Sequence, residues 1–236
     1  MKKLLTAALI LCCAASFAGC ASVAAGEAAE AFNGFVFDYD AQQLYIAGTA
    51  QLSFGSGQSQ TVLADNMSVK LKWDGSSRVG ELKSSVTMGG EEIMNYTLYA
   101  QDGVVYQDGE DIGQSLDSLL QNSFNMQTGE NMLSEDNIRS CTIENKDGQE
   151  IYNIIINKDS VPESLREMLI SSGGGVLTDA VFSNDLQAEV IYRDGEPLEF
   201  TITADMTATM MGTANTVMQA VIHTEVREFE DFEIAE

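Results

Sequence analysis

The sequence predicts an α+β fold, in which helices cover the concave face of a curved antiparallel β-sheet, a half-barrel of roughly eight to ten strands. Three observations predict it. Apolar and polar residues alternate along much of the chain, which is the period of a strand with one buried face. The pair Asp-Gly, which suits tight hairpins, occurs five times, at 74, 102, 108, 147 and 194. Two segments have the 3.6-residue period of an amphipathic helix, so we expect two or three helices.

The N-terminus has the anatomy of a bacterial lipoprotein signal. Lys2 and Lys3 precede an apolar run from Leu4 to Phe17, and Cys20 follows two small residues. Such a signal is removed, and the cysteine that becomes N-terminal carries a lipid. We therefore expect residues 1–19 to be a signal peptide and Cys20 to anchor the protein, through its lipid, to the extracytoplasmic side of a bacterial cell membrane. The alternative is an ordinary secretory signal that is cut near Ala24.

Composition divides the mature chain into a tether and one domain. Residues 20–31 are mostly Ala, Gly, Ser and Glu, and we expect them to form a flexible tether. Residues 32–236 are expected to fold as a single domain. If Cys20 is acylated, Cys141 has no disulfide partner within the mature chain, and we expect it to be a small buried apolar residue.

The mature chain is strongly acidic. The signal contains two of the 12 basic residues and none of the 36 acidic ones, so ten basic residues remain and the net charge becomes −26. Such a surface repels phosphates and anionic lipid headgroups. Nucleic acid is therefore excluded as a partner, and the membrane is expected to be held through the lipid alone.

The first part of the domain is predicted to be a meander of strands. Met67, Val69, Leu71 and Trp73 alternate with polar residues, and the turn Asp74-Gly75 follows them. The same alternation continues through three more strands, whose apolar positions are Leu82, Val86 and Met88, then Met94, Tyr96 and Leu98, then Val104, Val105 and Tyr106.

Two helices are predicted among the strands. The second runs from about Val161 to Ser171, with Ser160 as its N-cap, Glu163 as the capping-box partner, and a glycine run at 173–175 as its stop. Pro162 is expected in its first turn, where no amide donor is missed. The first helix is predicted from one apolar face, formed by Ile112, Leu116, Leu119, Leu120 and Phe124.

Hairpins complete the predicted sheet. Ile138–Glu144 and Glu150–Asn157 flank a turn that contains Asp147-Gly148. Near the C-terminus two long strands are expected to pair, and His223 lies on their polar face. Their apolar positions are Leu198, Phe200, Ile202, Ala204 and Met206 in one strand, and Met218, Ala220, Ile222 and Val226 in the other.

These features together resemble the LolA-like half-barrel lipoproteins, the superfamily that contains LolA, LolB and the mycobacterial LppX and LprG proteins. The chain looks most similar to the LolA-like lipoproteins of clostridia and related Gram-positive bacteria. The likeness rests on the signal that ends at Cys20, the hairpin Tyr99–Tyr106, the helix that follows it, and the turn Tyr192–Leu198 into a long strand. Many members also have a long amphipathic N-terminal helix, whereas residues 27–40 give only a weak helical pattern here.

The resemblance implies a non-enzymatic lipoprotein that binds or carries a lipid or another apolar ligand between sheet and helices. Methionines on the apolar phase of several strands favour this, because flexible thioether side chains repack around different guests. A merely loose core is the competing explanation. The residues expected to face the cavity are Trp73, Met88, Met94, Tyr96, Leu98, Phe200, Ile202, Met206 and Met218.

Two other functions stay open. The protein could be a cell-envelope interaction or sensor module with a filled core, which uses its sheet edge or outer face to bind a protein or a cell-wall component. More weakly, open acidic segments at 38–40 and 228–233 could hold cations. No catalytic residue, metal site or cofactor is predicted, because His223 is the single histidine and no calcium or phosphate loop is present.

Overall fold

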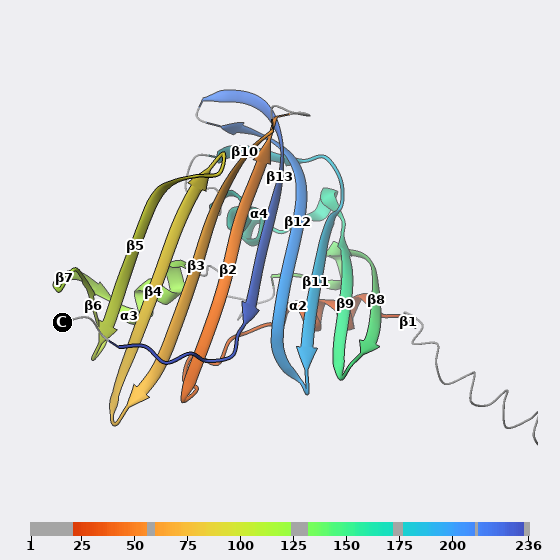
Figure 1. Cartoon of the computed structure of the whole chain (residues 1–236). Helices are drawn as coiled ribbons and strands as arrows, with labels where there is room; N and C mark the ends of the chain where they lie inside the picture. Colours follow the sequence, from red (N-terminus) through yellow and green to blue (C-terminus); the bar gives the residue numbers. More distant parts are fainter. Residues whose placement is uncertain (1–20, 56–59, 124–131, 172–176, 211, 234–236) are drawn as a thin grey trace, which may run out of the picture.

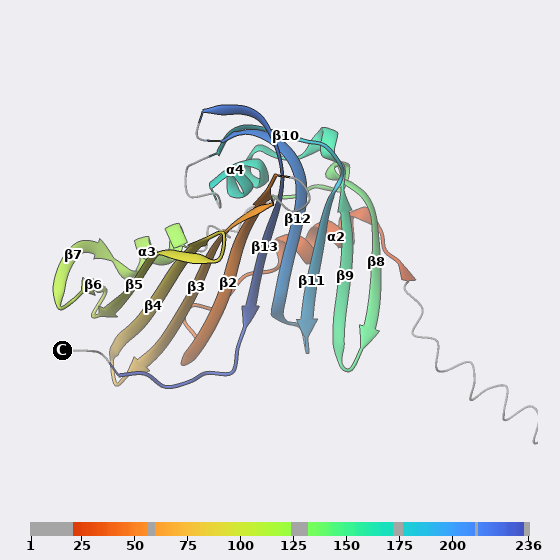
Figure 2. The same cartoon turned by 45° about the horizontal axis from the view of Figure 1, so that its top comes forward.

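The structure, a computed structural model, describes residues 21–55, 60–123, 132–171, 177–210 and 212–233. It contains one curved sheet of 13 strands in which every paired neighbour is antiparallel. Three helices of the described part lie on one face of the sheet (Figures 1 and 2). They are α2 (Ala25–Asn33), α3 (Leu116–Ser123) and α4 (Glu163–Ser171). The predicted α+β class with a curved antiparallel sheet is thus confirmed.

The strands follow the order β1-β8-β9-β11-β12-β13-β2-β3-β4-β5-β6-β7, and β10 pairs with the far end of β12. The hairpin that was predicted around Asp147-Gly148 is present as β8 and β9. The bounds are β1 Ala21–Ser22, β2 Gln43–Phe54, β3 Thr61–Asp74, β4 Ser77–Met88, β5 Glu91–Gln101, β6 Val104–Gln107, β7 Glu110–Ser115, β8 Ile138–Lys146, β9 Gln149–Ile156, β10 Leu177–Phe182, β11 Leu186–Arg193, β12 Glu196–Met210 and β13 Thr213–Val226.

Thirteen strands exceed the roughly eight to ten that were predicted. One of the additional strands, β1, has only two residues. A strand of that length contains too few positions for alternation to stand out. The longer β2 was also missed, because Ala and Gly interrupt its apolar positions.

Asp-Gly turns connect the hairpins in the way the sequence predicts. At 102–103, 108–109, 147–148 and 194–195 both residues have positive φ, between 52° and 82°. Positive φ at both central residues is the geometry of a type I′ turn, whose twist matches that of the flanking strands. At 74–75 only Gly75 has a positive φ, of 64°.

The register of the long C-terminal hairpin confirms the predicted pairing and shows which side chains share a face. Met206 lies opposite Met218, and Ile202 lies opposite Ile222. All four side chains are buried, since they point to the face that carries the helices. We call this side the helix-covered face and the opposite side the outer face.

The N-terminal segment corrects one prediction. Residues 20–31 were expected to be a flexible tether, but β1 pairs with β8, and α2 packs on the sheet. Ala28 and Phe32 are fully buried, and the Phe32 ring meets the Phe200 ring edge to face, with centroids 5.3 Å apart. Alanine has high helix propensity and lets a helix approach a sheet closely, so an alanine-rich composition does not imply disorder here. The folded part of the described chain therefore begins at Ala21 rather than at residue 32.

The two predicted helices start later than expected. Residues 110–115 form β7, and α3 begins at Leu116, so Ile112 belongs to a strand and is 36% exposed. The second helix, α4, begins at Glu163, while Ser160 ends a short 3-10 turn and Pro162 stands before the first helical residue. Leu165, Met168 and Leu169 of α4 are buried. The predicted end of the first helix at Phe124 and the glycine stop at 173–175 lie outside the described residues.

Candidate functional site

The residues that were expected to line an apolar cavity share the helix-covered face by strand register, but they differ in burial. Five of them are core residues that are at most 5% exposed: Leu98, Phe200, Ile202, Met206 and Met218. Trp73, near the end of β3, is 38% exposed, and its indole Nε1 donates to the carbonyl oxygen of Asp40 at 3.4 Å. Met88 and Tyr96 are partly exposed, and Met94 is 50% exposed. Cys20, the expected lipid anchor, lies outside the described residues.

The space between the sheet and α3 is filled. Leu116, Leu119 and Leu120 of α3 pack against Val69, Leu71, Leu82 and Leu98 of the sheet, and the hollow that remains among them is about 10 Å³. Gly80 allows this close packing, because a Cβ atom there would lie 3.0 Å from Leu71 Cδ2 and 3.6 Å from Leu116 Cδ1. A space of this size holds one water molecule at most. Under α3, therefore, the structure leaves no room for an acyl chain.

Beyond α3 the helix-covered face is less fully buried. Met67, Met88 and Met94 lie there on β3, β4 and β5, and we call these three residues the methionine patch. The strand register places Asp65 among them, where its carboxylate accepts a hydrogen bond from Ser84 Oγ at 3.1 Å. Burial raises the pKa of Asp65, and the bond from Ser84 opposes this change.

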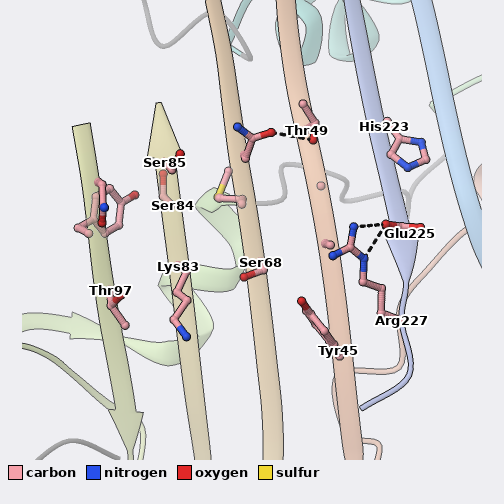
Figure 3. Close-up of a pocket in the computed structure, with 16 residues that line it drawn as sticks. Tyr45, Thr49, Ser68, Lys83, Ser84, Ser85, Thr97, His223, Glu225 and Arg227 are labelled. Carbon is pink, nitrogen blue, oxygen red and sulfur yellow. Dashed lines mark hydrogen bonds and ion pairs between the residues drawn. The ribbon is translucent and has the colours of Figure 1, made fainter. Parts of the chain in front are cut away.

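The outer face contains a large open hollow, which we call the outer trough (Figure 3). Its volume is about 530 Å³, and it extends across β13, β2, β3, β4 and β5. Hydroxyl, amide and aromatic side chains dominate its lining. The residues are Tyr45, Ala47, Gly48, Thr49, Asn66, Met67, Ser68, Lys83, Ser84, Ser85, Asn95, Tyr96, Thr97, His223, Glu225 and Arg227.

The charged groups of the outer trough are paired with one another. Arg227 Nε donates to Glu225 Oε1 at 2.6 Å, and Figure 3 shows this pair at one side of the trough. Lys83 Nζ lies 2.9 Å from a carboxylate oxygen of Glu81, which is only 6% exposed. The hydrogen bond to Glu81 raises the pKa of Lys83, so its ammonium group stays protonated at neutral pH. Both cations of the trough are thus balanced by adjacent carboxylates.

His223 lies at the edge of the trough on β13. Its Nδ1 is 3.0 Å from Thr201 Oγ1 and 3.7 Å from Glu199 Oε1. Its side chain is 33% exposed, so it is neither fully solvated nor buried. Among the described residues, no group of three or more His, Cys, Asp and Glu could hold a metal ion.

The C-terminal segment crosses the ends of β2, β3 and β4 on the outer face (Figure 1). Lys70 Nζ lies 3.2 Å from Glu230 Oε2, and Lys72 Nζ lies 2.6 Å from Asp231 Oδ1. Lys72 also lies over the Phe232 ring, 4.8 Å from its centroid, and Phe232 is 8% exposed. Lys70 and Lys72, which lie beside the trough on β3, are thus also paired with carboxylates, here from the C-terminal segment.

A second hollow continues the trough towards the β6–β7 hairpin. It has a volume of about 610 Å³ and shares Asn95, Tyr96 and Thr97 with the first. Its remaining lining residues are Tyr99, Gln107, Asp108 and Gly109. The two hollows together form a continuous polar surface from β13 to β6.

Cys141 is buried, at 3% exposure, which agrees with its predicted place in the core. Burial raises the pKa of its thiol to about 11, so the thiolate is scarce at neutral pH.

The described part of the chain contains no helix that is both long and apolar enough to cross a bilayer.

Sequence reasoning missed the outer trough. Most of its residues occupy the polar phase of the strands, which the alternation assigns to solvent. Met67, Ser84 and Tyr96 are the exceptions, and Tyr96 was among the residues expected to bind a ligand. The available signal was the type of residue at those positions: Thr49, Asn66, Ser68 and Thr97 are short hydrogen-bonding side chains in a chain that is otherwise rich in acids. The strand register shows which of these residues share a face, but it does not show that this face is hollowed.

The fold and this site define an α+β protein with one antiparallel sheet and an open polar hollow on its outer face. No protein-family model matches the chain, and no curated protein matches it significantly. Similar solved structures include an N-terminal dehydratase from the difficidin assembly line, at 10% identity and a TM-score of 0.16, covering 90% of this chain and 87% of that chain. An acyl-CoA hydrolase from Agrobacterium tumefaciens is 11% identical, with a TM-score of 0.19 and 70% of each chain covered. TM-scores this low carry no argument about this chain.

Proposed function

We propose that the protein is a non-enzymatic binding module of the cell envelope, which holds its partner in the outer trough. The size of the trough carries the proposal: about 530 Å³ is open on the outer face, against about 10 Å³ between α3 and the sheet. Ligand sites in proteins typically have volumes of roughly 300–1,000 Å³. Of the functions that the sequence leaves open, an envelope module that binds through its outer face therefore has the stronger geometric support.

Membrane attachment through Cys20 and descent from LolA-like lipoproteins belong to the same proposal. The signal anatomy of residues 1–20 supports the attachment. The relationship is supported by a curved antiparallel sheet with helices on one face, and by the helix α2 near the N-terminus, where members of that superfamily commonly have one.

The proposal predicts binding to the envelope of the producing bacterium that depends on the trough. A Cys20→Ser protein produced without residues 1–19, which cannot carry the lipid, would be incubated with isolated cell walls and membranes, sedimented and quantified, because the partner need not be known for this test. Ser85→Arg places a long side chain in the trough, whereas Ser140→Arg makes the same change at an exposed site on β8. We expect wild type and Ser140→Arg to sediment alike and Ser85→Arg to lose at least tenfold in apparent affinity, about 1.4 kcal/mol. Equal sedimentation of all three proteins, or of none, contradicts the proposal.

The methionine patch favours a second candidate function, the binding of an apolar guest. Met94 is half exposed on the helix-covered face, Met88 is partly exposed on the neighbouring strand, and Met67 is partly exposed two strands away. Flexible thioether chains suit a guest of variable shape. If this function is correct, lipid extraction and mass spectrometry of the protein purified from membranes will find a stoichiometric lipid. Met94→Asp should reduce its amount, and Ile93→Asp, a change at the neighbouring 60% exposed residue, is the control. Protein that carries no lipid would exclude this candidate.

A further inference from the structure

The backbone N–H and C=O groups on the floor of the trough are already paired between the strands of the sheet. From β13 through β2, β3 and β4 to β5, each strand pairs with its neighbours along nearly its whole length. A peptide that binds by adding a strand needs an open sheet edge, and the floor of the trough is not an edge. Recognition in the trough must therefore come from side chains.

The side chains that the trough offers are mostly uncharged hydrogen-bonding groups. Each hydroxyl both donates and accepts, and each carboxamide has two donors and an accepting oxygen. Thr49 Oγ1 already donates to Asn66 Oδ1 at 3.1 Å, which orients the amide (Figure 3). The groups of this kind in the lining are Thr49, Asn66, Ser68, Ser85, Asn95 and Thr97. A dense field of alternating donors and acceptors is complementary to a ligand that is itself rich in hydroxyl or amide groups.

The paired charges of the trough and the net charge of the mature chain argue against an ionic polymer as the ligand. The pairs Arg227–Glu225 and Lys83–Glu81 compensate the cations of the trough, and a net charge of −26 on the mature chain repels polyanions. A polycation would be attracted by the whole acidic surface rather than by this nearly neutral part of it. The trough is thus suited to an uncharged polar ligand.

The elongated form of the two joined hollows indicates a linear ligand. The trough opens on a sheet face, and the second hollow extends it past Asn95 and Thr97 to Gln107–Gly109. The ligand can therefore contact several strands in succession without a deep pocket for any one group.

We propose that the outer trough binds an uncharged glycan chain, whose hydroxyl and acetamido groups bond to the threonine, serine and asparagine side chains of β2 to β5. This inference rests on the proposed function, because it names the class of ligand for the same trough. A neutral polysaccharide fits the residue chemistry, the balanced charges and the open, elongated form.

Isothermal titration of the mature protein with three probes tests the inference. The probes are chitohexaose, cellohexaose and maltohexaose, which are uncharged and differ in linkage and in acetamido content. We expect at least one of them to bind with a dissociation constant of about 1 mM or tighter. If none of the three binds, the inference is overturned.

Variants then locate the binding. Asn66→Ala and Thr97→Val remove hydrogen-bonding groups from the trough, and we expect each to weaken the best probe at least fivefold. Asn184→Ala is the matched control, because Asn184 is also exposed and its amide bonds only to Asp205 Oδ2, away from the trough, among the described contacts. Melting temperatures close to that of wild type will show that the variants fold. Equal affinity of Asn66→Ala, Thr97→Val and Asn184→Ala would place the probe elsewhere and overturn the inference.

The sedimentation assay separates this inference from the proposed function. If no oligosaccharide binds but Ser85→Arg still abolishes envelope binding, the glycan is wrong and the trough remains the binding surface. If Ser85→Arg has no effect in that assay, the proposed function fails as well.

Discussion

Asp65 is a carboxylate on the mostly apolar, helix-covered face of the sheet. It lies on the helix-covered face between Leu63 and Met67, and burial raises the pKa of its carboxyl group above the usual 3.8. The folded protein therefore binds this proton more tightly than the unfolded chain does. Asp65 contributes most to stability below pH 3.8, and this contribution is lost as the pH rises through the pKa of the folded state.

The sign of this shift gives a prediction at the scale of one residue. Asp65→Asn keeps the shape and the bond to Ser84 but has no charge, so we expect a higher melting temperature than that of wild type at pH 7. The advantage should vanish below about pH 3.8, where wild-type Asp65 is also neutral. Melting curves between pH 3 and pH 8 measure it, with the exposed Asp159→Asn as control. A variant that gains nothing at pH 7 would show that the carboxylate is well solvated in the folded protein.

At the scale of elements, α2 is held to the sheet by specific contacts as well as by apolar packing. The Tyr192 hydroxyl on β11 donates to the carbonyl oxygen of Ala31 at 2.6 Å, and burial raises the pKa of Tyr192 to about 12. The Asn33 carboxamide joins the backbone of Leu133 by two bonds, of 2.8 and 3.0 Å. The end of the helix is therefore tied to two segments that are distant in sequence.

Removing one of these ties should loosen α2. Tyr192→Phe deletes the hydroxyl and leaves the Ala31 carbonyl without it, which we expect to lower the free energy of unfolding by about 1–2 kcal/mol. Tyr106→Phe on β6 is the matched control and should change stability by less than about 0.5 kcal/mol. Urea unfolding measures both. Equal midpoints for Tyr192→Phe and wild type would mean that water replaces the tyrosine at Ala31.

The same elements show what sequence can and cannot predict. Asp-Gly pairs and strict alternation identified the hairpins, because both signals are local and the turn at 147–148 needs no tertiary context. The helix α2 was not predicted, because an alanine-rich stretch becomes ordered only when Phe32 packs against Phe200, which is a tertiary contact. Ile112 was placed in a helix because a single apolar residue fitted the period of those after it. The trough could not be predicted, because hollowing arises from how whole strands curve and twist together.

At the scale of the whole molecule, one sheet connects every strand of the described chain. The path from β1 to β7 has no break, and the apolar cluster contains residues from both halves, including Leu82 and Cys141. A continuous ladder over a shared core should unfold as one unit.

Two local probes test this cooperativity. Trp73, the single tryptophan, reports on β3, and Cys141 reports on β8 near the opposite edge of the sheet. The buried thiol, with its pKa raised to about 11, should react with Ellman's reagent only after unfolding. In a Cys20→Ser protein produced without residues 1–19, we expect tryptophan fluorescence, far-ultraviolet circular dichroism and pulsed thiol labelling to share one urea midpoint. Separate midpoints for the two probes would divide the sheet into independent folding units.

The pairing of Ala21 with Ile143 determines how the molecule would stand on a bilayer. If Cys20 carries the lipid, the acylated residue is bonded directly to the first residue of β1, about 3.8 Å away from Cα to Cα, with no slack between them. The β8 edge would then rest beside the headgroups. The strands of the trough would lie five to nine neighbours further along the sheet, which is roughly 25–45 Å from β1 measured across the strands. The width of the sheet, rather than a stalk, would thus limit the protein to partners in the layer immediately outside the membrane.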